Sequence, residues 1–259
     1  MATQLIANDE ASDIFAGLDT QSIALLLDVD GTLVDIGPAP NDVHIAADLP
    51  DLLVRLSQAT GGALALVSGR PVADLDALFA PLKLPAVGGH GAELRVRGGE
   101  AASSVAPLSP DLRRHLAAAA TLGSGIIVED KGYSLALHYR QAPQQEERLR
   151  SYIAAGRAAH PGEATEVLPG KAMLEVKRPD VSKSDGVREL MRCPPFAGRV
   201  PVFIGDDVTD ESVFAILGDL GGKGFSVGRH FAGLAGMFDS PFDVRRALQR
   251  LAAKAQARS

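Results

Sequence analysis

The chain has 259 residues, of which 46% are hydrophobic and 22% charged, and its formal net charge at pH 7 is −6. This balance is typical of a globular protein with one large domain or two unequal ones. The negative charge, the lack of tryptophan and the aromatic content of 5% argue against nucleic acid and against an anionic membrane surface as partners. They do not argue against a small anionic substrate, because a local cation overrides the overall sign.

Nothing near the N-terminus predicts secretion or a membrane anchor. Residues 1–15 have neither a basic start nor an apolar run, and the apolar segment 23–27 is too short to span a bilayer. Cys193 is the single cysteine, so an intrachain disulfide is excluded. We therefore expect a cytoplasmic protein.

Short apolar runs alternate with helical patterns in the first part of the chain. Segments 23–27, 63–67 and 85–88 are apolar and predict buried strands, and the spacing of apolar residues over 49–56 and 71–79 predicts helices between them. Alternating strands and helices indicate βαβ units and therefore an α/β fold with a Rossmann-like parallel sheet.

From about residue 94 the pattern changes to alternating polar and apolar residues. Two such segments meet at Lys131-Gly132, as in a β-hairpin, and a third covers 172–177. Helices are predicted around 111–121 and 143–159. The segment 105–178 is therefore predicted to be an inserted α+β domain.

After Pro179 the first pattern returns. It predicts helices over 183–191 and 210–217, a buried strand over 200–204 and a last helix through Val244 and Leu251. Residues 1–104 and 179–259 are thus predicted to form one discontinuous core domain.

Paired aspartates directly follow the first predicted strand, in Asp28-Val29-Asp30-Gly31-Thr32. Open α/β sheets bind ligands at the carboxyl ends of their strands, and Gly31 permits a sharp turn there. One carboxylate is able to attack phosphorus while the other transfers protons, and both are suited to a hard cation. A polar turn explains the same residues without chemistry.

Three further polar segments also follow a predicted strand or begin a helix. The acidic run Gly205-Asp206-Asp207-Val208-Thr209-Asp210 crowds negative charge and favours a divalent cation, with oxygen ligands indicating magnesium rather than zinc. Ser68-Gly69-Arg70 offers a hydroxyl and backbone amides to phosphoryl oxygens, or a helix cap. Lys183 lies at a predicted helix start, where the helix dipole disfavours a cation.

The order and spacing of these four segments resemble the motifs of haloacid-dehalogenase (HAD) superfamily phosphatases. The resemblance implies that Asp28 is the nucleophile and that Asp30 is first the general acid and then the general base. It also implies that Ser68 binds the phosphoryl group, that Lys183 offsets negative charge, and that Mg2+ is held by Asp28, the backbone carbonyl of Asp30 and Asp206. Asp207 and Asp210 would support that metal site.

The insertion resembles a C2-type cap, and its details resemble the trehalose-6-phosphate phosphatase family. The matching stretches are GGHGAE at 88–93, VEDKG at 128–132, HYR at 138–140, GK at 170–171 and LEVK at 174–177. The resemblance implies that Glu129, Lys131 and Glu175 hold sugar hydroxyls. The other candidate substrate contacts are Gly69, Arg70, His90, His138 and Arg140.

Strand periodicity places the charged candidates of the insertion together. Glu129 and Lys131 share one face of their strand, His138 and Arg140 share a face, and Glu175 lies opposite its apolar neighbours. A face with both charge signs suits a hydroxyl-rich ligand, but an ordinary solvated sheet face has the same pattern. Two positions depart from the family pattern: Ser184-Asp185-Gly186 follows the lysine, and Val208 occupies a position where proline is frequent.

Several functions are compatible with these residues. The main hypothesis is a phosphatase acting on trehalose 6-phosphate, with functional coupling to a separate trehalose-6-phosphate synthase as the partner interaction. Sucrose phosphate, a glucosylglycerol-type phosphate and a hexose phosphate are alternative substrates. A regulatory module phosphorylated on aspartate is opposed by the second aspartate, Asp30, and by the large insertion. An inactive relative is opposed by the presence of Asp28 and Asp206. The oligomeric state is not predicted.

Overall fold

The computed structural model describes residues 8–36, 43–103, 105–170, 172–179 and 181–257. The chain divides into two compact units. The core unit comprises Met1–Ala102 and Ser182–Ser259, and the inserted unit comprises Ser103–Val181. No helix among the described residues has both the length and the apolar character needed to cross a membrane.

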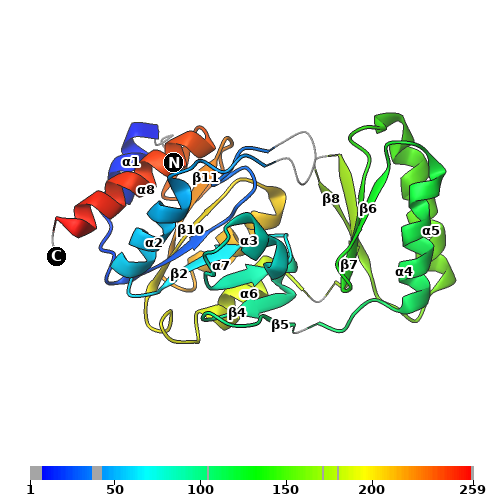
Figure 1. Cartoon of the computed structure of the whole chain (residues 1–259), viewed down its shortest axis with the longest axis horizontal. Coiled ribbons are helices and arrows are strands. Elements are labelled where there is room, and N and C mark those ends of the chain that lie inside the picture. The colour runs from blue at the N-terminus through cyan, green and yellow to red at the C-terminus, as the bar shows by residue number, and fades with distance from the viewer. Residues whose placement is uncertain (1–7, 37–42, 104, 171, 180, 258–259) are drawn as a thin grey trace. The chain divides into compact units, whose positions relative to one another are not determined.

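The core unit contains an eight-stranded sheet in the order β12-β11-β10-β1-β2-β3-β4-β5 (Figure 1). Neighbouring strands from β12 to β3 are parallel, and β4 is antiparallel to β3. The strands are β1 (Ile23–Leu27), β2 (Leu64–Val67), β3 (Ala86–Gly88), β4 (Glu93–Arg95), β5 (Ala102–Ser103), β10 (Val200–Gly205), β11 (Lys223–Val227) and β12 (Gly236–Phe238).

Helices cover both faces of this sheet, which explains why its central strands are continuous apolar runs. Leu25 and Leu27 of β1 pack in one apolar cluster, whereas Leu26 packs in the cluster on the other face. The first cluster includes residues of α1 (Asn8–Ala16), α2 (Leu49–Ala59), α3 (Val72–Leu78) and α8 (Pro241–Gln256), and the second includes residues of α6 (Lys183–Leu190) and α7 (Glu211–Leu217). The predicted α/β core is therefore confirmed.

The inserted unit contains a four-stranded antiparallel sheet in the order β6-β7-β9-β8. Helices α4 and α5 lie against one face of it (Figure 1), where Leu112, Leu149, Leu135 and Leu174 share one buried cluster. The elements are α4 (Pro110–Ala117), β6 (Ile127–Asp130), β7 (Ser134–His138), α5 (Glu146–Ala159), β8 (Glu166–Gly170) and β9 (Met173–Lys177).

The two segments through which the chain enters and leaves the inserted unit are hydrogen-bonded to each other. Arg178 donates from Nε to the carbonyl of Ala106 and from Nη2 to the carbonyl of Pro107, both at 3.0 Å. Lys177 donates from Nζ to the carbonyls of Arg178 and Val181. The entry and exit segments are thus fixed against one another within this unit.

Several elements are absent from the sequence prediction. Strand β8 includes Pro169 and Gly170, both unfavourable in a strand, but it lies at the sheet edge, where a residue without an N–H is tolerated. The helix α1 and the outer strands β5, β11 and β12 were not predicted either. Lys171, in one of the family-like stretches, lies outside the described residues.

Candidate active site

Three predicted site residues follow neighbouring parallel strands. Asp28 follows β1, Ser68 follows β2 and Asp206 follows β10, and β1 lies between the other two strands. Since the carboxyl ends of parallel strands lie at one edge of a sheet, the fold brings these side chains to a common edge.

Lys183 connects two of the acidic segments at this edge. Its Nζ donates to Oδ1 of Asp28 at 2.8 Å and to Oδ1 of Asp210 at 2.7 Å, and all three residues are buried. Burial opposes the lysine charge, but the carboxylates of Asp210 and Asp28 outweigh it and raise the pKa of Lys183 above its usual value. Burial, followed by the charge of Asp210, raises the pKa of Asp28 well above its ordinary value, although Lys183 acts in the opposite direction.

The residues around Lys183 explain how a lysine is held at a helix start. Ser182 is the N-cap of α6 and forms a capping box with Asp185: the Asp185 N–H donates to Ser182 Oγ, and the Ser182 N–H donates to the Asp185 carboxylate. Gly186 lies where a Cβ would approach Val87 Cγ1 to 2.4 Å. The Ser-Asp-Gly sequence after the lysine therefore forms a regular helix start that directs Lys183 toward the carboxylates.

Carboxylate oxygens of Asp28, Asp206 and Asp210 lie within 4.8 Å of one another. Oδ1 of Asp210 accepts from Lys183, and its Oδ2 accepts from the backbone N–H groups of Asp206 and Asp207, both at 3.0 Å. Asp210 thus shapes the loop that carries Asp206, and Asp28 and Asp206 are the better candidate ligands. An all-oxygen donor set fits a hard divalent cation.

Gly31 lies directly against the carboxylate of Asp206. It has φ +83°, and a Cβ there would lie 2.2 Å from Oδ2 of Asp206. Both the backbone conformation and the space therefore require glycine. Asp207 lies at the start of the next helical turn and accepts from the Val208 N–H at 2.7 Å.

Asp30 forms a bidentate ion pair with Arg70. The Arg70 Nε and Nη2 donate to Oδ2 and Oδ1 of Asp30, both at 2.7 Å. The Arg70 N–H donates to Ser68 Oγ at 3.1 Å, which leaves the Ser68 hydroxyl hydrogen for another acceptor. The ion pair joins the loop after β1 to the loop after β2.

The GGHGAE segment at 88–93 lies against the loop 68–70. Gly89 N–H donates to the carbonyl of Arg70 at 2.8 Å, and His90 N–H donates to the carbonyl of Ser68 at 3.1 Å. His90 has φ 55°, which is uncommon for a residue with a side chain, and a Cβ on Gly69 would lie 2.5 Å from its ring. The structure thus places His90 and Gly69 in contact with each other beside Ser68.

The polar face of the inserted sheet brings four of its five candidate residues together. Glu175 is buried and accepts from Lys131 Nζ at 3.3 Å and from Ser134 Oγ at 2.6 Å. Glu129 contacts His138 Nε2 at 3.2 Å and Lys131 Nζ at 3.9 Å. Burial opposes ionisation of Glu129, but the His138 hydrogen bond and the Lys131 charge outweigh it and lower the pKa of Glu129.

The prediction for the inserted unit was wrong about the position of Arg140 and omitted Ser134. Arg140 lies beyond the end of β7 in an exposed turn, so it does not share a strand face with His138. Ser134 was not a candidate, although the same alternation that placed Glu129 also places Ser134 on the polar face, where β7 pairs with β9. The alternation was the available signal for the face, but the partner depends on the register of β7 and β9, which sets Ser134 opposite Lys177 and diagonal to Glu175.

The model of the trehalose-phosphatase family matches residues 26–231, a span that contains all of these residues. The chain belongs to the trehalose-phosphatase family. It is 38% identical over 234 residues to a probable trehalose-phosphate phosphatase of Sinorhizobium fredii, covering 87% of each chain. It is 39% identical over 207 residues to the trehalose-6-phosphate phosphatase of Escherichia coli, covering 79% of this chain and 77% of that one.

Solved structures support the same trehalose-phosphatase fold. The C-terminal domain of a Candida albicans trehalose-6-phosphate phosphatase matches with a TM-score of 0.78 at 20% identity, over 97% of this chain and 98% of that one. A trehalose-6-phosphate phosphatase related protein matches with a TM-score of 0.74 at 21% identity, over 91% and 99% of the two chains. At these identities the structures establish the HAD-like fold rather than the substrate.

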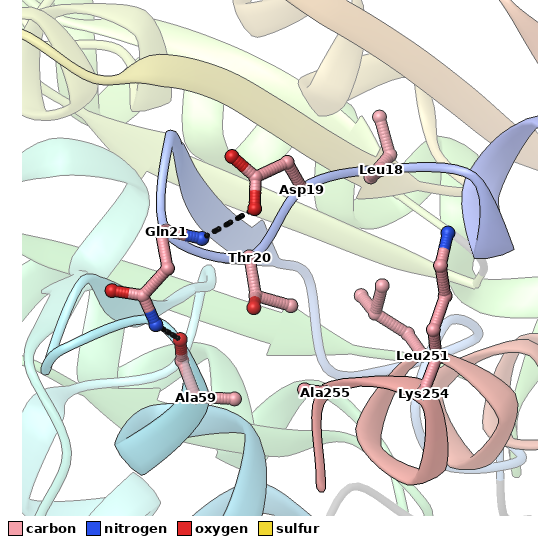
Figure 2. A pocket seen from close by; sticks show the side chains of 8 residues that line it. All are labelled: Leu18, Asp19, Thr20, Gln21, Ala59, Leu251, Lys254 and Ala255. Atoms are coloured by element: carbon pink, nitrogen blue, oxygen red, sulfur yellow. Dashed lines mark hydrogen bonds between the residues drawn. The ribbon is translucent and has the colours of Figure 1, made fainter. Parts of the chain in front are cut away.

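In this trehalose-phosphatase family member, a pocket of about 260 Å³ lies near the residues that precede β1, away from the acidic cluster (Figure 2). Leu18, Thr20 and Gln21 line it and precede β1, whereas Asp28 follows the same strand. The Gln21 side chain donates from Nε2 to the Ala59 carbonyl at 2.7 Å, closing one side. This pocket is therefore separate from the acidic cluster.

Proposed function

We propose that this chain hydrolyses trehalose 6-phosphate to trehalose and phosphate through an aspartyl phosphate on Asp28, with Mg2+ as cofactor. The observation that carries the proposal is the cluster in which buried Lys183 contacts Asp28 and Asp210 beside Asp206. The relatives named for this activity are 38% and 39% identical, which supports the same substrate here.

In the first step, an Asp28 carboxylate oxygen attacks phosphorus and the bond from phosphorus to the sugar oxygen breaks. Lys183 holds Oδ1 of Asp28, so Oδ2 is the oxygen available for attack. Asp30 gives its proton to the departing sugar oxygen, and the Ser68 hydroxyl donates to a phosphoryl oxygen. Phosphoryl transfer depends on this positioning and on charge neutralisation.

In the second step, Asp30 takes a proton from a water molecule that attacks the phosphorus of the aspartyl phosphate. The bond between phosphorus and Asp28 breaks, which regenerates the carboxylate and releases phosphate. Asp28 and Asp206, with the backbone carbonyl of Asp30, would hold the Mg2+ ion. When bound, that ion neutralises phosphate charge and favours the ionised form of Asp28.

The inserted unit is proposed to be a cap that selects the sugar. Glu129, Lys131 and Glu175 would bind hydroxyl groups, because carboxylates accept and ammonium groups donate hydrogen bonds. The contacts of these residues with His138 and Ser134 fix their side chains on one sheet face.

Phosphate release from a panel of sugar phosphates tests the proposed function. We expect hydrolysis of trehalose 6-phosphate in preference to sucrose, glucosylglycerol and hexose phosphates, with activity lost in chelator and restored by Mg2+. Preference for another sugar phosphate would contradict the proposed substrate but not the proposed aspartyl-phosphate mechanism. Absence of release from every ester would favour a regulatory or inactive protein, and full activity in chelator would contradict the cofactor.

Removing the cap carboxylates tests sugar binding separately. Glu129→Ala and Glu175→Gln are expected to raise KM for trehalose 6-phosphate by about 10- to 100-fold, since a hydrogen bond to a charged group contributes roughly 1.5–3 kcal/mol. Hydrolysis of p-nitrophenyl phosphate should change little. Glu146→Ala is the matched control, because Glu146 lies on α5, among the helices on the other face of the sheet. Equal losses on both esters would remove these residues from sugar binding.

A further inference from the structure

The guanidinium group of Arg70 contacts the proposed acid–base residue with two of its three nitrogen atoms. Nε and Nη2 each lie 2.7 Å from one oxygen of Asp30, and the Arg70 side chain is only 16% exposed. A fork of this kind fixes the plane and direction of a carboxylate far better than a single donor does.

We propose that Arg70 is a positioning residue for proton transfer, one that orients Asp30 toward the leaving oxygen and does not itself bind the phosphoryl group. This inference rests on the proposed function, in which Asp30 is the acid and then the base. Each carboxylate oxygen has two lone pairs, and the fork uses one on each oxygen. The remaining lone pair of either oxygen is able to carry the proton while Arg70 stays in place.

The backbone of Arg70 is hydrogen-bonded to the GGHGAE segment and to Ser68. The Arg70 carbonyl accepts from the Gly89 N–H at 2.8 Å, and its N–H donates to Ser68 Oγ at 3.1 Å. Glu93 at the end of the segment accepts from the Val72 N–H at 2.6 Å, just after the loop. The GGHGAE segment thus holds in place the loop that carries Arg70.

The same segment also contacts the residues that present Lys183. Gly91 has φ +106°, and a Cβ there would lie 2.0 Å from the carbonyl oxygen of Ser182, the N-cap of α6. No side chain fits between the two backbones. One short segment therefore touches both the loop that orients Asp30 and the helix start that presents Lys183.

The test compares leaving groups, because only a poor leaving group needs a proton in the first step. We expect Arg70→Lys to lower kcat/KM for the best alkyl phosphate of the panel by about 10- to 100-fold, within the range of general acid–base catalysis. For 2,4-dinitrophenyl phosphate, kcat/KM should change by less than about threefold, since that phenolate departs without protonation. Equal losses on both esters would show that Arg70 contacts the phosphoryl group and overturn the proposal. No loss on either would overturn it as well.

A double-mutant cycle with Asp30→Asn separates positioning from a general structural role. If Arg70 acts through Asp30, adding Arg70→Lys to Asp30→Asn causes no further loss of kcat/KM on the alkyl phosphate. If the loss of kcat/KM in the double variant equals the product of the two single losses, the inference is contradicted. Glu93→Gln should give the same leaving-group dependence with a smaller loss, and the thermal midpoint of each variant checks that it remains folded.

The two proposals fail in different ways. If the wild-type protein releases no phosphate from any ester, the proposed function fails. If the wild-type protein is active and Arg70→Lys shows equal losses on all esters, only the role of Arg70 fails. The choice of the best alkyl phosphate makes the test independent of which sugar the protein prefers.

Discussion

Asp28→Asn is expected to abolish phosphate release from every ester, with a loss of at least about 10⁴-fold in kcat. The amide has the shape of the carboxylate but does not form the phosphoryl bond, and Lys183 keeps its contact with Asp210 at 2.7 Å. The measurement is single-turnover release with enzyme in excess. Substantial residual turnover would contradict the assignment of the nucleophile.

The same variant is expected to be more stable than the wild type in chelator at neutral pH. Burial and Asp210 raise the pKa of Asp28, so the folded protein holds its proton to higher pH than the unfolded chain does. The free energy of unfolding therefore falls as the pH rises above the pKa that Asp28 has in the unfolded chain. A neutral amide at position 28 does not ionise, so the variant avoids this decrease. Thermal unfolding at neutral pH and at pH 4 checks the sign: the gain should shrink in acid.

Lys183→Met is expected to abolish phosphatase activity and to lower the free energy of unfolding. Its Nζ contacts Asp28 and Asp210 in a buried site, and breaking a buried ion pair by removing one partner destabilises a protein by about 3–5 kcal/mol. Denaturant unfolding measures the change in the free energy of unfolding. Lys254→Met is the matched control, because that lysine is half-buried but donates to the carbonyl of Ala16, with an expected change of about 1 kcal/mol.

A compensating variant distinguishes charge from packing at this position. Adding Asp210→Asn to Lys183→Met should recover part of the lost stability, since one unpaired carboxylate is removed and the amide oxygen still accepts from the N–H groups of Asp206 and Asp207. Activity should not return. If the double variant were less stable than Lys183→Met, the loss would come from packing around the lysine stem.

The residues at the carboxyl edge of the core sheet were predictable because their signals are local. Asp28, Ser68 and Asp206 each stand directly after a short apolar run, and parallel strands bring such positions to one edge. Lys183 was a candidate because a cation at a helix start is unfavourable without a partner. The structure supplies that partner in Asp210, which the sequence suggested only as metal support.

Contacts between distant segments were not predictable in the same way. Arg70 and Asp30 are 40 residues apart, and Ser134 and Glu175 are 41 apart. Which side chains meet across such distances depends on strand order and register, and periodicity alone does not fix either. The edge strand β8 was missed for a related reason, since Pro169 and Gly170 oppose the local signal while pairing with β9 forms the strand.

The hydrogen bonds of Arg178 to Ala106 and Pro107 have a consequence for how this chain is built. An inserted unit whose entry and exit segments lie side by side is exchangeable as a whole. Its removal leaves two chain ends of the core that a short linker is able to join. We expect the eight-stranded sheet to keep its strand order after such an exchange, because its strands other than β5 pair within the core unit. If the inserted unit selects the sugar as proposed, exchanging it would change the substrate while Asp28, Ser68 and Asp206 keep their places after the strands of the core sheet.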